Sequence, residues 1–256
     1  MSTSATLLLL ADSRFPTGAH AHSAGIEASH GRGDIGSVHD LAQFLDGRLL
    51  TTAPVEAAFA AAACAAVGAA AAVPSVDADG VSPHSIRTQS ELTASGPHRT
   101  GSLAELDHEL QIRTPSPRLR QVSRSLGRQL LRPAERAWPS DRYASLRALH
   151  SDGPMQPIAL GVVAAAAGLA PRDAALCSLH HLVGAATTAA VRLLGLDPFD
   201  VHALAARLAP SLDKIAAEAA RVAATRAPHE LPATTSLLAD ILAEHHATWE
   251  VRLFAS

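Results

Sequence analysis

The feature that most limits the possible folds is an apolar stretch from Pro54 to Val73, in which alanine dominates and Glu56 is the single charged residue. Alanine, the best helix former, makes up about a fifth of the chain, whereas aromatic residues, which favour strands, make up 3%. The stretch is about as long as the roughly 20 residues that span a bilayer, but alanine contributes little to insertion and Glu56 opposes it. We therefore expect a buried helix in an all-α soluble protein, not a membrane span.

Proline and glycine positions predict where the other helices begin and end. One expected helix begins after Ser116-Pro117, and others run over 155–167, 171–194 and 234–249. A further helix begins after Asp197-Pro198 and is interrupted at Pro210. No segment alternates apolar and polar residues at strand spacing, so we expect no sheet. The sequence predicts a single-domain multi-helix bundle over residues 1–256, in which residues 75–102, rich in Ser, Pro and Gly, form a flexible insertion.

Charge and cysteine content argue against several classes of protein. The formal net charge is −3, so the overall field gives no general attraction for nucleic acid. Cys64 and Cys177 lie far apart in apolar surroundings, which excludes a disulfide framework and fits a reducing cytoplasm. The N-terminal Leu7–Leu10 run is short and has no preceding basic residue, so it does not predict a secretory signal.

Three patterns that can indicate catalysis or cofactor binding lack their usual context. Gly31-Arg32-Gly33-Asp34-Ile35-Gly36 matches the dinucleotide fingerprint but follows a helical segment where a strand is needed, so we expect an interhelical loop. Ser13 and Ser23 lack a nucleophile elbow. We predict no catalytic residue, no cofactor and no protein-held metal, and we expect the adjacent pairs His180-His181 and His245-His246 to be polar rims. A metal-dependent hydrolase using His20, His22 and Asp12 stays open as an alternative.

Arginines at positions 120, 124, 128 and 132 are spaced four apart, which stacks them along one side of a helix. The opposite side carries an apolar stripe of Leu119, Val122, Leu126 and Leu130. Because like charges at this spacing repel, the row needs acidic neighbours. These are either internal residues, such as Glu105, Asp107 and Glu109, or an acidic protein partner.

The C-terminal end is unusually apolar, since Trp249, Val251, Leu253 and Phe254 fall within its last few residues. Chain ends are usually polar and frayed. This tail either docks on its own core or inserts into another chain, and the residues alone do not decide between the two.

Three motifs together resemble the UreF family of urease accessory proteins. The first is Leu10-Ala11-Asp12-Ser13-Arg14-Phe15-Pro16-Thr17-Gly18 with His22-Ser23-Ala24-Gly25-Ile26-Glu27. The second is Arg120-Gln121-Val122-Ser123-Arg124-Ser125-Leu126-Gly127-Arg128, and the third is Trp249-Glu250-Val251-Arg252-Leu253-Phe254-Ala255-Ser256. They occur in the family's order.

The resemblance implies an all-helical, non-catalytic chaperone that forms a homodimer. It implies binding to the accessory protein UreD (also called UreH) and recruitment of the GTPase UreG, so that nickel reaches apo-urease; it implies neither nucleic acid nor membrane as a partner. The family's tail is associated with the UreD contact, which favours insertion into a partner. The partner-binding residues implied are Asp12, Ser13, Phe15, Pro16, Gly18, His22, Ser23, Gly25, Glu27, Arg120, Arg124, Gly127, Arg128, Trp249, Glu250, Arg252, Leu253, Phe254 and Ser256. A helical partner-binding protein unrelated to urease is the remaining alternative.

The chain also departs from the family pattern at a few positions. His20 stands where the family commonly has an aromatic residue, Met155 stands where a histidine is frequent, and residues 75–102 extend the usual length. These departures affect contacts of the replaced side chains and not the expected fold.

Overall fold

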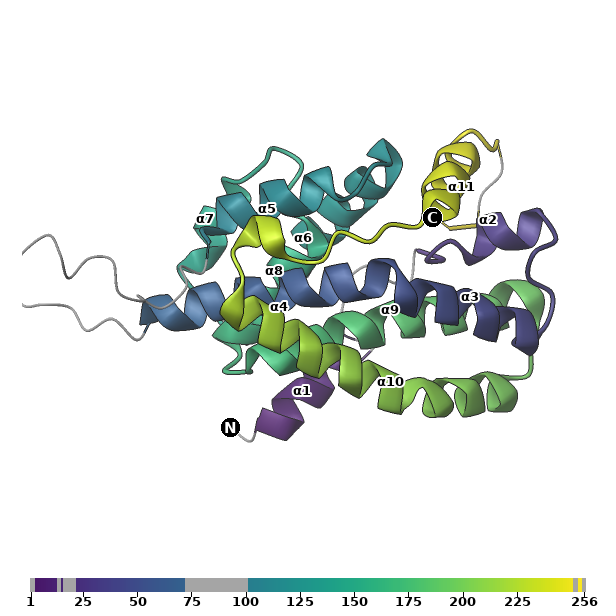
Figure 1. Ribbon diagram of the computed structural model, residues 1–256, viewed down its shortest axis with the longest axis horizontal. Helices are drawn as coiled ribbons and strands as arrows, with labels where there is room; N and C mark the ends of the chain where they lie inside the picture. Colours follow the sequence, from purple (N-terminus) through teal and green to yellow (C-terminus); the bar gives the residue numbers. More distant parts are fainter. Residues whose placement is uncertain (1–2, 13–14, 16–21, 72–100, 251–252, 255–256) are drawn as a thin grey trace, which may run out of the picture.

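The computed structural model describes residues 3–12, 15, 22–71, 101–250 and 253–254, and within these ranges the regular structure is helical with no strand. The helices are α1 (Thr3–Ala11), α2 (Ile26–Gly31), α3 (Val38–Leu50), α4 (Thr52–Ala71), α5 (Leu103–Ile112), α6 (Pro117–Ala137), α7 (Arg142–Arg147), α8 (Gln156–Ala166), α9 (Pro171–Leu194), α10 (Pro198–Thr225), the 3-10 helix η3 (Pro228–Glu230) and α11 (Leu237–Ala247) (Figure 1). The all-α prediction is confirmed. Most of the expected insertion, residues 75–100, lies outside the described residues.

Local capping residues set many helix ends as expected. The Ser116 hydroxyl accepts a hydrogen bond from the Leu119 backbone N–H at the start of α6. Helix α9 runs from Pro171 to Leu194 and stops at Gly195, whose φ of 65° is the left-handed conformation that glycine allows at a helix end. The glycine pattern at 31–36 is the link between α2 and α3, as predicted.

Two helices differ from their expected bounds by more than two residues. Helix α10 continues through Pro210, so the expected interruption there is wrong. Pro210 removes one backbone hydrogen bond, but it lies on the exposed side, where water can solvate the freed carbonyl, while Leu208 and Leu212 hold the helix on the core. Helix α11 begins at Leu237, three residues later than expected.

Helix α4 is the centre of the core, and it runs through the middle of the molecule in Figure 1. It packs against α3, α5, α8, α9 and α10, and residues 57–64 are buried on every side. The small alanine side chains let neighbouring helices approach closely: a Cβ added at Gly161 of α8 would lie 2.3 Å from the Ala60 carbonyl oxygen. Within the described residues the apolar stretch is thus helical, as its composition predicts, and its central part is buried.

Within the described residues, α9 is long and apolar enough to cross a membrane by length and composition, and α3 with α4 meets the test only as a pair bent by 48°. More than half of the most apolar part of α9, 56%, is buried inside the protein. Helix α9 packs against α4, α8 and α10, so its apolar residues serve the core.

Candidate partner-binding site

The N-terminal and C-terminal motifs meet at the carboxylate of Glu27 on α2. One oxygen, Oε1, accepts the backbone N–H of Leu253 at 2.7 Å, and the other, Oε2, accepts that of Phe254 at 3.0 Å. The Nε2 atom of His246 also lies 3.0 Å from Oε2. Glu27 is 7% exposed and His246 is fully buried, so the tail is held by a network shielded from water. Figure 1 shows α2 and α11 side by side.

The tail also packs through its aromatic side chains. Phe254 is 7% exposed and belongs to the main hydrophobic core, with the Arg192 guanidinium 5.1 Å from its ring centroid. Trp249 lies so close to α2 that a Cβ at Gly31 would stand 2.3 Å from its ring. Of the two arrangements that the sequence left open, Phe254 is therefore docked on its own core, whereas Leu253 and Glu250 are exposed.

The two histidine pairs differ from the expected polar rims. His246 is buried against Glu27, and the Nε2–H of His181 donates to the Leu10 carbonyl oxygen at 3.0 Å. Burial lowers the pKa of His181 to about 4, so its ring is neutral and links α9 to α1. Adjacent residues on a helix point about 100° apart, so one of each pair faces inward. His180 and His245 are the exposed members.

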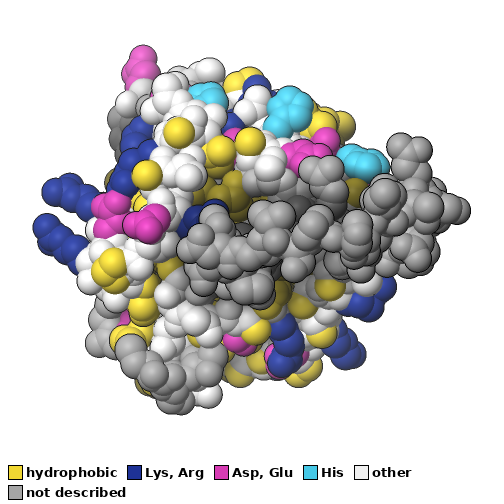
Figure 2. Space-filling model, turned by 90° about the vertical axis from the view of Figure 1, so that its left-hand side faces the viewer, with side chains coloured by type: hydrophobic (Ala, Val, Ile, Leu, Met, Phe, Trp, Pro, Cys, Tyr) yellow, Lys and Arg dark blue, Asp and Glu magenta, His cyan; other side chains and the backbone are white. Residues whose placement is uncertain are grey.

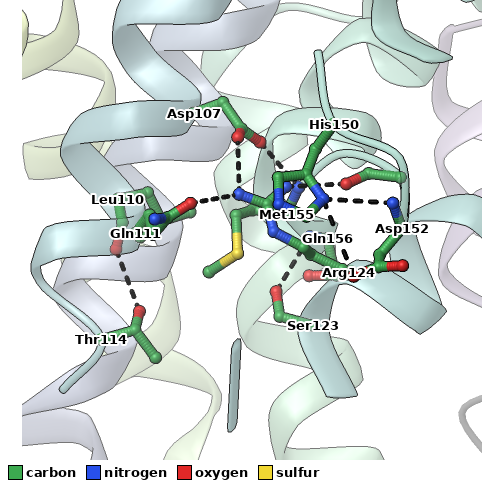
Figure 3. Close-up of polar contacts among 11 residues, drawn as sticks. Asp107, Leu110, Gln111, Thr114, Ser123, Arg124, His150, Asp152, Met155 and Gln156 are labelled. Atoms are coloured by element: carbon green, nitrogen blue, oxygen red, sulfur yellow. Dashed lines mark hydrogen bonds and ion pairs between the residues drawn. The ribbon is translucent and has the colours of Figure 1, made fainter. Parts of the chain in front are cut away.

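In the middle motif, Arg124 is buried, with only 4% of its surface exposed. Figure 3 shows it among Asp107, Gln111 and Met155. Its Nη2 donates to the Asp107 carboxylate at 3.0 Å and to the Gln111 side-chain oxygen at 2.6 Å, and its Nη1 donates to the Gly153 carbonyl oxygen at 2.7 Å. The second Asp107 oxygen accepts the Met155 backbone N–H at 2.8 Å. This cluster joins α5, α6 and the turn before α8.

Gly127 adds a close backbone contact to the same junction. A Cβ at Gly127 would stand 2.1 Å from the Pro154 carbonyl oxygen, a distance that requires the backbone to shift. The Ser123 hydroxyl, one turn earlier, accepts the Gln156 backbone N–H at 3.0 Å. The close approach that Gly127 permits is therefore made within this chain.

We predict that Gly127→Ala lowers the free energy of unfolding by about 1–3 kcal/mol, because the added methyl group meets a backbone carbonyl that cannot rotate away. Gly47→Ala is the matched control, since Gly47 lies inside α3 with nothing within 4 Å of an added Cβ. The control should raise stability by up to about 1 kcal/mol through helix propensity. Urea unfolding followed by far-ultraviolet circular dichroism measures the free energy of unfolding of both variants. If the two variants change it equally, the close contact between Gly127 and Pro154 is contradicted.

The arginine row does not stay on one side of α6. Four residues advance a helix by about 400°, so the row turns by about 40° at each step. Arg120 is half-buried and donates to the Thr114 and Pro115 carbonyl oxygens, and Arg124 is buried. Arg128 and Arg132 are exposed. Of the internal acidic neighbours considered, Asp107 pairs with Arg124, Glu109 pairs with Arg113 and Glu105 caps α5.

The apolar stripe of α6 lines a groove of about 600 Å³. Leu119, Val122 and Leu126 are half-buried there, and only Leu130 of the expected stripe is fully buried. The groove lies between α2, α3, α6, α9 and α11, and His22 and Gly25 of the first motif contribute to its wall. Sequence reasoning missed this groove; the signal that it had was the apolar stripe of α6, which predicts an apolar face on that helix.

The remaining residues of the first motif have varied settings. Phe15 stacks on Trp138 with ring centroids 5.5 Å apart, and Asp12 accepts the Phe15 backbone N–H through its carbonyl oxygen at 2.9 Å. Ser23 is fully buried, and its hydroxyl accepts the Glu27 N–H at 3.4 Å. Gly25 has a φ of 92° at the start of α2. The proposed residues Ser13, Pro16, Gly18, Arg252 and Ser256, and also His20, lie outside the described residues.

Among the described residues, no group of three or more His, Cys, Asp or Glu side chains is arranged to hold a metal ion. His22 is 8% exposed on the groove wall. In the described residues, hydrogen bonds and packing hold the motifs together at two junctions, called here the joints, one at Glu27 and one at Arg124. The described residues form a helical protein whose surface carries a groove, a docked tail and charged helix edges.

Comparison with known proteins gives the family. The UreF family model matches residues 35–209. The chain is 37% identical to the urease accessory protein UreF of Mycobacterium sp. (strain JLS) over 257 residues, covering both chains fully, and 37% identical to that of Mycolicibacterium vanbaalenii over 256 residues, also with full coverage. It is 35% identical to UreF of Mycobacterium tuberculosis (strain ATCC 25618 / H37Rv) over 223 residues, 86% of each chain. The chain belongs to the UreF family, whose members are accessory proteins and not enzymes.

Proposed function

We propose that this protein is a scaffold for urease maturation in the cytoplasm. In this role a homodimer binds UreD (UreH) and recruits the GTPase UreG, so that nickel is delivered to apo-urease. The observation that carries the proposal is the full-length match to urease accessory proteins named UreF. The assembly of the first and third motifs around Glu27 supports it, because two segments that mark the family then lie at one place in the fold.

The tail is the proposed contact for UreD. Leu253 is 74% exposed although its backbone N–H is fixed by Glu27, so its apolar side chain is presented outward from an anchored backbone. Preorganisation of this kind lowers the ordering cost of binding. Glu250 is exposed beside it.

The proposed mechanism is positional. The scaffold holds UreD and the GTPase in one arrangement, which couples nucleotide state to nickel release through binding free energy, without a bond made by this chain. Nickel is the cargo of this process. The residues of the joints at Glu27 and Arg124 act by keeping the docking surfaces in register.

The test is reconstitution of urease maturation with and without this chain. Urease subunits, UreD and UreG from the same urease gene cluster are co-expressed with the chain carrying an affinity tag. We expect both accessory proteins in the purified complex and urease activity that depends on the chain. Normal activation in its absence, with neither protein recovered, would contradict the proposal. A stoichiometric metal in the chain purified alone, together with hydrolytic activity lost in His22→Ala, would favour the hydrolase alternative.

A further inference from the structure

The turning of the arginine row around α6 separates it into two parts with different environments. The part formed by Arg120 and Arg124 faces the protein and is bonded there. The row continues beyond its expected end to Arg136, and Arg128, Arg132 and Arg136 are all exposed. We call these three residues the arginine edge. It extends over about 12 Å of helix, at a rise of about 1.5 Å per residue.

The charges of the arginine edge are not neutralised inside the described part of the chain. Arg128 donates to the Asp152 backbone carbonyl oxygen at 3.1 Å, which carries no full charge. Arg132 and Arg136 make no ion pair or side-chain hydrogen bond within the described residues. The acidic side chain on the same part of α6, Glu135, is already paired with Arg147 of α7. Like charges four residues apart on a helix repel one another, so the edge is better stabilised by external carboxylates.

The surroundings favour a protein partner over a nucleic acid. The chain carries a net charge of −3 even with this edge included, so its overall field repels a long polyanion. Basic and acidic side chains also lie next to one another on the described surface in Figure 2, which matches a mixed protein surface better than a uniform phosphate backbone. Guanidinium groups bind carboxylates through two parallel hydrogen bonds, so a short row of Asp and Glu side chains is the complementary surface.

We infer that the arginine edge is the docking surface for an acidic face of a partner protein. This inference rests on the proposed function, which includes recruitment of UreG, and it adds that the edge is where UreG docks. Arg124, although part of the same sequence motif, takes no part in the contact and instead holds α6 in place. The edge acts chiefly on the rate and strength of encounter through electrostatic attraction.

The experiment compares two charge-reversed variants of the full-length chain. Arg132→Glu/Arg136→Glu reverses two charges of the edge, and Arg207→Glu/Lys214→Glu reverses two exposed charges on α10 as a matched control. Binding of purified UreG is measured by isothermal titration calorimetry at about 50 mM and about 500 mM salt. We expect the edge variant to bind about tenfold more weakly at low salt, a smaller loss at high salt, and near-wild-type binding by the control.

Each other outcome separates the inference from the proposed function. Equal weakening in both double variants would attribute the effect to net charge and overturn the inference. If the edge variant binds UreG as tightly as the wild-type chain does, the inference is overturned and the proposed function stands. If the wild-type chain binds neither UreG nor UreD, the proposed function fails. Preferential binding of a duplex DNA probe through the edge would replace the acidic protein with a nucleic acid.

Discussion

Asp107→Ala will lower the free energy of unfolding by about 3–5 kcal/mol, because it leaves the Arg124 guanidinium buried without its counter-charge. The side chains of Asp107 and Arg124 are 7% and 5% exposed, so water cannot replace the lost carboxylate without opening the junction. The same substitution removes the acceptor for the Met155 backbone N–H. Both losses act at the joint between α5, α6 and the turn before α8.

The control for this prediction is Asp213→Ala, which removes a carboxylate from an exposed ion pair with Arg172. Exposed pairs contribute about 0–1 kcal/mol, so the control should unfold at nearly the wild-type urea concentration. A double variant, Asp107→Ala/Arg124→Met, removes the uncompensated charge and should recover part of the stability. Chemical unfolding followed by circular dichroism measures all three. If the two aspartate variants lose the same stability, Arg124 is not held by a buried charge pair.

Removing the Glu27 carboxylate will release the tail and abolish capture of UreD. Glu27→Ala leaves the N–H groups of Leu253 and Phe254 without their acceptor and His246 without its partner at Oε2. The expected stability loss is about 1–3 kcal/mol, the cost of leaving buried polar groups unsatisfied.

Deletion of residues 250–256 should also abolish capture of UreD while the helical core stays folded, because the tail is terminal.

Hydrogen–deuterium exchange of the C-terminal peptide measures tail release directly. In Glu27→Ala the amides of Leu253 and Phe254 should exchange much faster, while amides of α4 keep their protection. Glu218→Ala, which alters an exposed carboxylate on α10, should change neither exchange nor UreD capture. A truncated chain that still captures UreD at wild-type strength would reject the tail as the contact.

The helices could be predicted well from the sequence because their signals are local. Ser116-Pro117, the 171–194 segment and Gly195 each place a cap, a first-turn proline or a left-handed residue within a few positions of a helix end. The interruption expected at Pro210 is wrong because packing of Leu208 and Leu212 on the core outweighs the local tendency of proline to break a helix. That packing depends on other helices and cannot be predicted from the neighbouring residues. The candidate site residues were proposed from the resemblance, and their role in partner binding stays a prediction.

Sequence alone determined the all-helical class, most helix boundaries and the family motifs, since each depends on residues close together in the chain or on their order. Only the tertiary structure decided that Glu27 binds the backbone of residues 253 and 254, more than two hundred positions away, and that Arg124 is buried while Arg132 is exposed. For the arginines, the physical reason is that a four-residue spacing does not match the 3.6-residue helical turn, so successive arginines point in different directions. Which arginine faces the core therefore depends on where the other helices lie.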